Sequence, residues 1–76
     1  MNSDKVTVIL FLKSLNRKID IEIPADITFE ELSKGLSSAF GIEPPDHISA
    51  ENPVVLLKGN RNLRQFNIRN GSMLIV

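Results

Sequence analysis

Apolar side chains recur at every second position near the start of the chain, namely at Val6, Val8, Leu10 and Leu12. A two-residue period is typical of a β-strand that buries one face. The isoleucines at 19, 21 and 23 continue this period and alternate with charged residues, which predicts a second strand. Turn-forming residues between the two runs, Ser14 and Asn16, predict a hairpin, and Pro24 should end the pairing because it lacks a backbone donor.

The sequence ITFEEL at positions 27–32 predicts the N-terminus of a helix. Thr28 can accept a hydrogen bond from the amide of Glu31, and the Glu31 carboxylate can accept one from the amide of Thr28, which together form a capping box. Gly41 can end the helix in a left-handed conformation. We attribute Gly35, inside the helix, to a close approach of helix and sheet. The apolar residues at helical spacing, which should face the sheet, are Phe29, Leu32, Leu36, Ala39 and Phe40.

The second half of the chain predicts two further strands joined by irregular segments. Residues 41–52 contain two adjacent prolines, so we expect an irregular crossover that Ile42 and Ile48 hold to the core. Residues 54–58 and 73–76 are expected strands, each bounded by Gly and Asn residues. Between them, the expected core anchors are Leu63, Phe66 and Ile68.

A hairpin, a helix, a crossover and two more strands predict an α+β fold of the β-grasp type. In this arrangement a mixed sheet of four to five strands carries a single helix across one face, and the first and last strands are parallel neighbours. A chain of 76 residues is long enough for one core only, so we expect a single domain over residues 1–76.

The sheet face opposite the helix is the predicted interaction site. Successive side chains of a strand point to opposite faces, and a single helix covers one face only. We expect Met73 and Ile75 to face the helix. Exposed apolar patches of this kind commonly mark interaction sites, and Phe11 and Leu56 would be the central anchors for a protein partner or for a second copy in a homodimer. The predicted partner-binding residues are Ile9, Phe11, Leu56, Leu74 and Val76.

The net charge is zero, but the charges are unevenly distributed along the chain. Residues 53–76 contain no acid and four bases, which could form a basic patch for an acidic partner. Nucleic acid is a less favoured partner because the sequence pI is about 6.6 and Phe66 is the single aromatic residue among these bases. The four bases are Lys58, Arg61, Arg64 and Arg69.

The residues do not suggest an enzyme, a cofactor or a metal site. The chain has no cysteine, so neither a thiolate nucleophile nor a thiolate metal site is available. His47 is the one histidine, and Glu30 and Glu31 are explained by their position at a helix N-terminus. The start of the chain lacks a secretory signal pattern, and the longest apolar run, at 8–12, is too short to cross a bilayer. We therefore expect a cytoplasmic protein without membrane insertion.

Several segments resemble those of ubiquitin-like proteins over nearly the whole chain. VTVILFL and ITFEEL are similar to the first strand and helix entry of that fold, and VVLLKGN, QFNI and NGSMLIV to its third strand, short helical turn and final strand. The Ile-Pro-Ala-Asp lead into the helix and the end at the last strand most resemble the YukD/EsaB family. That family comprises small accessory proteins of the type VII, or WXG-motif, secretion system of Gram-positive bacteria. The resemblance implies a non-enzymatic cytoplasmic protein that associates with a membrane secretion machine or regulates it.

Two alternative functions are compatible with the same fold. A ubiquitin-type modifier needs a flexible C-terminal tail ending in Gly-Gly, whereas Leu74, Ile75 and Val76 belong to the last expected strand. Conjugation is therefore disfavoured unless the natural chain is longer. The other alternative is a generic ubiquitin-like adaptor domain, which could be a fragment of a larger membrane component.

Overall fold

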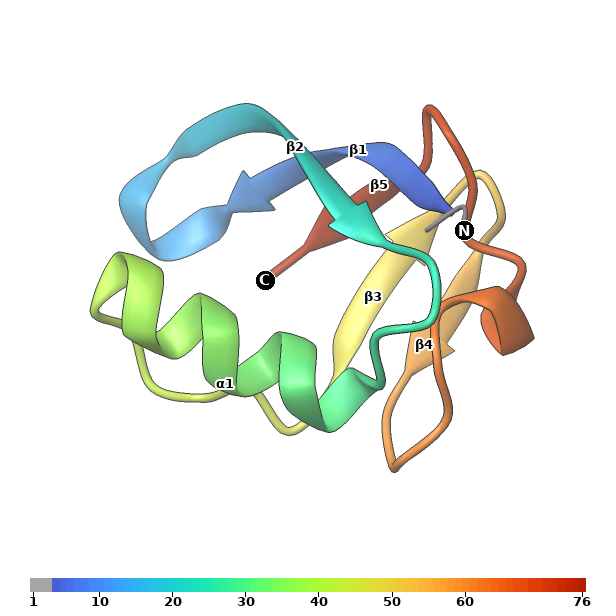
Figure 1. Cartoon of the computed structure of the whole chain (residues 1–76). Helices are drawn as coiled ribbons and strands as arrows, with labels where there is room; N and C mark the ends of the chain where they lie inside the picture. Colours follow the sequence, from blue (N-terminus) through green and yellow to red (C-terminus); the bar gives the residue numbers. More distant parts are fainter. Residues whose placement is uncertain (1–3) are drawn as a thin grey trace.

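The computed structural model describes residues 4–76, which form a five-stranded mixed sheet curved around one helix (Figure 1). The strand order is β2-β1-β5-β3-β4, and β1 and β5 are parallel neighbours, as the sequence predicts. The predicted β-grasp fold is confirmed. In chain order the elements are β1 (Lys5–Leu12), the 3-10 turn η1 (Lys13–Leu15), β2 (Arg17–Pro24), α1 (Phe29–Phe40), β3 (Ile48–Glu51), β4 (Val55–Leu57), the 3-10 turn η2 (Arg64–Phe66) and β5 (Met73–Ile75).

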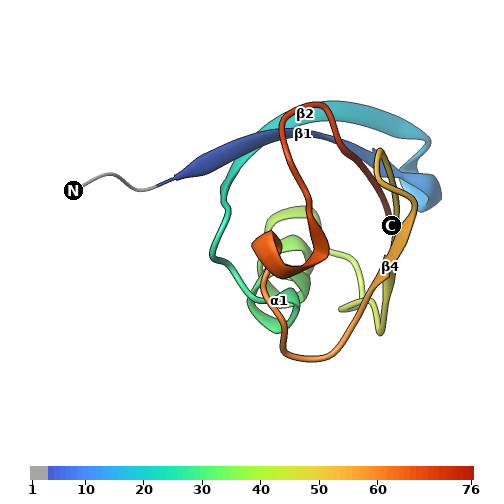
Figure 2. The same cartoon turned by 90° about the vertical axis from the view of Figure 1, so that its right-hand side faces the viewer.

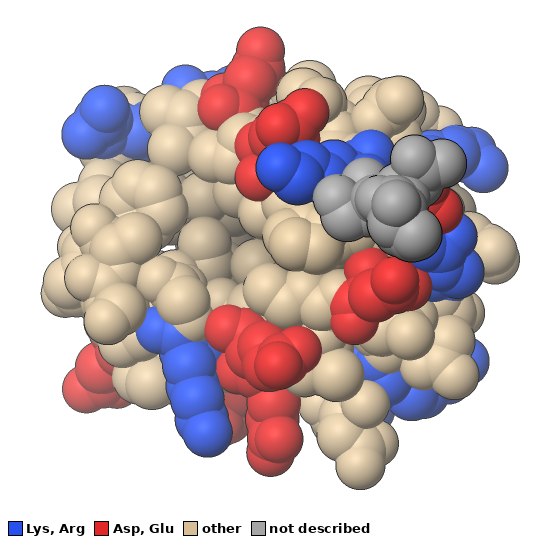
Figure 3. All heavy atoms as spheres, viewed as in Figure 1, with Lys and Arg blue, Asp and Glu red and all other residues tan. Residues whose placement is uncertain are grey.

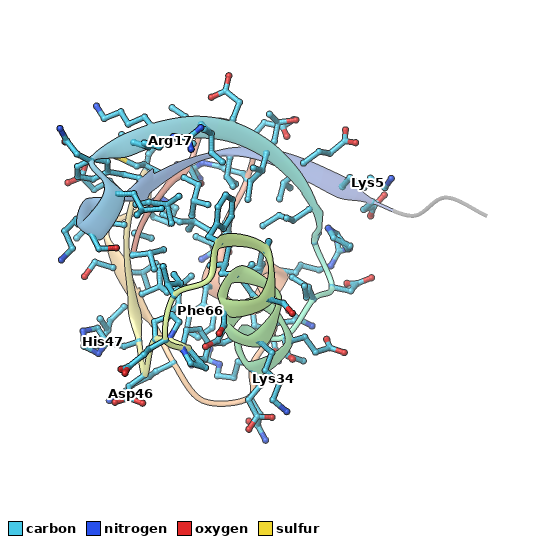
Figure 4. All side chains as sticks on the ribbon, turned by 90° about the vertical axis from the view of Figure 1, so that its left-hand side faces the viewer. Lys5, Arg17, Lys34, Asp46, His47 and Phe66 are labelled. Carbon is cyan, nitrogen blue, oxygen red and sulfur yellow. The ribbon has the colours of Figure 1, made fainter. Side chains whose placement is uncertain are left out.

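The sheet has a concave face that contacts α1 and a convex face that does not. Figure 2 looks along α1 and shows the strands as an arch around it. The concave side contains the core, in which Val8, Leu10 and Leu12 of β1 are between 0% and 1% exposed. Leu63, Phe66 and Ile68, in the segment between β4 and β5, are buried, as predicted. Figure 4 shows Phe66 inside the arch beside α1.

Helix α1 begins and ends where the sequence predicts. The amide of Glu31 donates to Thr28 Oγ1 at 3.1 Å, and the amide of Thr28 donates to Glu31 Oε1 at 3.0 Å, which completes the capping box. Gly41 has a φ of 67°, and its amide donates to the carbonyl of Ser37 at 2.9 Å. Ala39 is exposed, contrary to expectation, so the buried stripe consists of Phe29, Leu32, Ser33 and Leu36, with Phe40 half-buried.

The expectation that Gly35 permits a close helix-to-sheet approach is wrong. Gly35 is exposed, and no heavy atom lies within 4 Å of the position that a Cβ would occupy. The glycine therefore costs helix stability without a packing benefit.

We expect Gly35→Ala to stabilise the fold by about 0.5–1 kcal/mol, because alanine restricts the unfolded chain and has the higher helix propensity. Urea unfolding monitored by circular dichroism measures this change. An unchanged or lower free energy of unfolding would indicate that position 35 makes a contact that only glycine allows.

Residues 48–51 form a regular strand, where the sequence predicted an irregular crossover. Strand β3 pairs with β5 on one side and with β4 on the other, both antiparallel. Its alternation is real, since Ile48 and Ala50 are buried while Ser49 and Glu51 are exposed, but four residues give too short a pattern to recognise. The neighbouring strands stabilise this segment more than its own propensity does. Ile42 and Ile48 contact the core, as predicted.

Candidate protein-interaction site

The final strand faces the opposite way from the prediction. Leu74 is paired with Leu10 across the parallel β5 and β1, and residues paired in this way share a sheet face. Leu74 is accordingly 0% exposed and belongs to the core. Val76 lies beyond the end of β5, is half-buried and packs against the same core. Neither Leu74 nor Val76 is therefore part of the convex face, and their assignment to the partner-binding site is wrong.

The error arose because the sequence MLIV contains four consecutive apolar residues. Such a run has no two-residue period, so it does not indicate which side chains are buried. The pairing with β1 decides the orientation, and it is set by residues before β5. The amide of Thr7 donates to Asn70 Oδ1 at 2.8 Å, the amide of Gly71 donates to the Thr7 carbonyl at 2.9 Å, and the amide of Ile9 donates to the Ser72 carbonyl at 2.9 Å.

Met73 and Ile75 occupy the convex face, where the sequence had placed Leu74 and Val76. Met73 is paired with Ile9, and Ile75 with Phe11. All four side chains are half-buried, and none of them belongs to the core or packs against it. Leu56 of β4 is 45% exposed and lies on the same face, because its partner Ser49 is also paired with Ile75. We define the convex-face patch as Ile9, Phe11, Leu56, Met73 and Ile75.

The convex face is arranged in two cross-strand rows. The first row runs across all five strands and contains Lys18, Phe11, Ile75, Ser49 and Leu56. The second row contains Asp20, Ile9, Met73 and Glu51. Leu56 stands at the edge strand, so the middle of the patch is formed by Met73 and Ile75 on the central strand β5. Phe11 remains next to this centre, and Leu56 is peripheral.

Charged side chains border the convex-face patch, with Lys18 at one end of the strands and Asp20, Glu22 and Lys5 toward the other. Lys18 lies over the Phe11 ring, with Nζ 5.7 Å from the ring centroid. Asp20 is paired with Ile9, and Glu22 with Thr7 further toward the start of β1. Lys5 Nζ is 4.0 Å from Glu22 Oε1. The patch is therefore a preformed apolar surface between a lysine and carboxylates.

Of the four bases in residues 53–76, Arg64 forms ion pairs with acids. Arg64 Nη2 lies 3.0 Å from Asp26 Oδ1 and 3.2 Å from Asp4 Oδ2, so acids from the first half of the chain balance its charge. The hydrogen bond with Asp26 raises the pKa of Arg64 above its ordinary value. The guanidinium of Arg61 stacks over Phe66 at 5.0 Å. Arg69 donates to Asn52 Oδ1 at 3.2 Å, and Lys58 is exposed beside β4.

The helix-bearing side carries basic and acidic side chains interspersed with other residues (Figure 3). A shallow depression of about 340 Å³ lies between α1 and the loop before β3. Ser33 lines it, but its hydroxyl donates to the Pro45 carbonyl at 2.9 Å. His47 is exposed and points away from α1 (Figure 4). Within residues 4–76, no group of three or more His, Cys, Asp or Glu residues lies close enough to hold a metal ion.

Across that same described range, no helix has the length and hydrophobicity needed to cross a bilayer.

Comparison with known proteins supports both the fold and a family. The family model described as WXG100 protein secretion system (Wss), protein YukD, matches residues 5–76. The C-terminal ubiquitin-like domain of mouse tubulin-specific chaperone e is similar, with a TM-score of 0.79 at 14% identity, over 100% of this chain and 88% of that chain. For the ubiquitin-like domain of tubulin-binding cofactor B the TM-score is 0.76 at 16% identity, over 97% and 89%.

A designed protein based on ubiquitin has a TM-score of 0.73 at 21% identity, over 93% of this chain and 84% of the designed chain. At such identities these likenesses concern the fold alone. Among curated proteins, none matches the sequence significantly.

Proposed function

Because this chain belongs to the YukD family of the WXG100 protein secretion system, we propose that it is a non-enzymatic, cytoplasmic interaction module of that system. Its role is accessory or regulatory, and its partner is a cytoplasmic region of a membrane component of the secretion machine. The fold is compatible with this role because one face of its sheet is not covered by α1.

The observation that carries the proposal is the apolar composition of the convex face. Five large apolar side chains lie there without a covering helix in the described part of the chain, and none of them packs against the core. Exposed apolar patches on small monomeric domains commonly mark contact sites. Burying a fully exposed side chain of this size contributes about 1.5–3 kcal/mol. Four of the five are already half-buried, so each contributes less than this, and binding depends on several of them together.

The geometry of the sheet explains how the module would select its partner. The patch is built on paired strands, so its side chains are positioned before binding, and little conformational entropy is lost on association. A matching partner presents apolar side chains to Phe11, Met73 and Ile75. Its charges should be opposite to those of Lys18 and Asp20, which border the patch in adjacent rows and would fix the orientation of the complex.

We expect the double substitution Phe11→Ser and Ile75→Ser to abolish capture of the cytoplasmic regions of the system's membrane components. We assign both residues as hot spots, whose truncation costs about 2 kcal/mol or more, so at least about a tenfold loss of affinity is expected for each position. The measurement is a pull-down, followed by calorimetric titration with the captured region.

The matched control is Leu15→Ser, which changes an exposed leucine of η1 outside both rows. It should leave capture intact. Circular dichroism establishes that the double variant remains folded. Undiminished capture by a folded double variant would refute the convex face as the binding site.

A further inference from the structure

We propose that the convex-face patch also binds the same patch of a second copy of this chain, in a two-fold dimer whose β1 strands run antiparallel. The inference rests on the proposed function in one respect, since it concerns the same face. It adds what occupies that face when the secretion partner is absent.

A two-fold dimer requires a surface that is complementary to itself. The convex face has this property along the strand direction. From the start to the end of β1, its convex-face residues are paired with Glu22, Asp20 and Lys18 of β2 in turn. Lys13 follows the end of β1. On the other side of the patch, Glu51 belongs to the row of Asp20. Lys5 lies 4.0 Å from Glu22 at the start of β1, so the charge order that two copies can match is that of Asp20 and Lys18.

Two sheets that pack face to face keep their strands aligned within about 30°. The two-fold axis then lies in the interface, either across the strands or along them. An axis across the strands, between the two rows, places each strand on the same strand of the second copy with reversed direction. The first row of one copy then faces the second row of the other.

This arrangement brings matching side chains together. Lys18 faces Asp20 of the second copy, Phe11 faces its Ile9, and Ile75 faces its Met73. Each contact occurs twice because of the symmetry. Two ion pairs would thus border the β2 side of an apolar centre made from β1 and β5 of both copies, and Glu51 would face the polar Ser49 on the other side.

A two-fold axis along the strands would bring together side chains of the two copies that fit each other poorly. It places β2 of one copy on β4 of the other, so Lys18 would face Leu56 and Ile9 would face Glu51 of the second copy. Burying a charged group against an apolar side chain without a partner is costly. The residues of the two rows therefore select the antiparallel dimer over the parallel one.

The dimensions of the patch predict a weak and reversible dimer. Five strands spaced about 4.8 Å apart make a sheet roughly 24 Å wide along its arch, and two convex faces touch over only part of this width. The two rows also extend only about 7 Å along the strands. A standard interface buries about 800 Å² per partner, which would be about one sixth of the 4784 Å² surface of this domain. The convex-face patch is smaller than that, so a secretion partner with a larger contact could displace the second copy. Self-association would then keep the apolar face covered until the partner binds.

Charge-reversal variants of the full chain test this geometry by sedimentation equilibrium over a range of protein concentrations. The wild-type chain should show a concentration-dependent dimer. Lys18→Glu alone, or Asp20→Lys alone, should weaken it by at least about tenfold, because each homodimer would contain two like-charge contacts. An equimolar mixture of the two variants should restore association, since every contact between positions 18 and 20 again joins opposite charges. Lys34→Glu, an exposed charge reversal on α1, is the matched control and should change nothing.

A wild-type chain that stays monomeric, or a mixture that fails to restore the dimer, would overturn the inference. So would a dimer that Phe11→Ser abolishes but the charge variants leave unchanged. These outcomes are separate from the proposed function. A monomer whose capture by a membrane component depends on Phe11 contradicts only the dimer, whereas a dimer that captures no component contradicts only the proposed function.

Discussion

Leu74→Ala is expected to lower the free energy of unfolding by about 2–5 kcal/mol, whereas Ile75→Ala is expected to cost no more than about 1 kcal/mol. Leu74 is 0% exposed and paired with Leu10 in the core, so its truncation leaves a cavity. Ile75 lies on the convex face and does not pack against the core. At about 0.05–0.15 kcal/mol per residue, a domain of this size has only about 4–11 kcal/mol of stability in total, so the first substitution is severe.

Urea unfolding of both variants measures this difference, and partner capture should rank them in the opposite order. Ile75→Ala should weaken capture while leaving stability nearly unchanged. Leu74→Ala should retain capture under conditions in which it remains folded. A larger loss of stability from Ile75→Ala than from Leu74→Ala would mean that the orientation of β5 is reversed. The convex face would then contain Leu74 instead of Ile75.

The elements that depend on local signals could be predicted from the sequence. The hairpin follows from the alternation around Leu10 and Ile21, and helix α1 follows from the capping box at Thr28 and Glu31 and the glycine at 41. Each of these signals is contained within a few neighbouring residues, so no knowledge of distant partners is needed.

The elements that depend on pairing between distant segments could not be predicted in the same way. β3 has only four residues and is stabilised by β4 and β5 on its two sides. β5 is uniformly apolar, so only its register with β1 shows that Leu74 is buried and Ile75 is not. Three of the five predicted site residues, Ile9, Phe11 and Leu56, lie on the convex face. Thr7 and Lys13 mark the polar face of β1 in the sequence, whereas residues 54–57 are as uniformly apolar as β5, so only strand pairing shows the face of Leu56.

The predicted basic patch illustrates the same limit for charge. The sequence shows four bases and no acid in residues 53–76, but the fold brings Asp4 and Asp26 to Arg64. Charge composition along a segment therefore does not give the charge of the surface that the segment forms. The order of charged side chains along the convex face depends on how the strands pair. The geometry of the proposed dimer follows from this pairing and not from the sequence alone.

Ser72→Ala is expected to destabilise the fold by about 1–3 kcal/mol, although it removes a single oxygen atom. Ser72 is 0% exposed, and its hydroxyl donates to the Asn52 carbonyl while accepting from the Arg69 amide at 3.0 Å. Alanine would leave both backbone groups without this partner. These bonds join the turn between β3 and β4 to the segment before β5, so they help to hold the central strand, and with it Met73, in its register on the convex face.

Urea unfolding measures the loss of stability, and hydrogen exchange of the Arg69 amide measures the local effect. In Ser72→Ala this amide should exchange faster by more than the global loss of stability explains, because its acceptor is gone. Ser14→Ala, at an exposed serine of η1, should leave both quantities within about 0.5 kcal/mol of the wild type. If Ser72→Ala has wild-type stability and unchanged exchange at Arg69, the register of β5 is held by its backbone pairing with β1 and β3 alone.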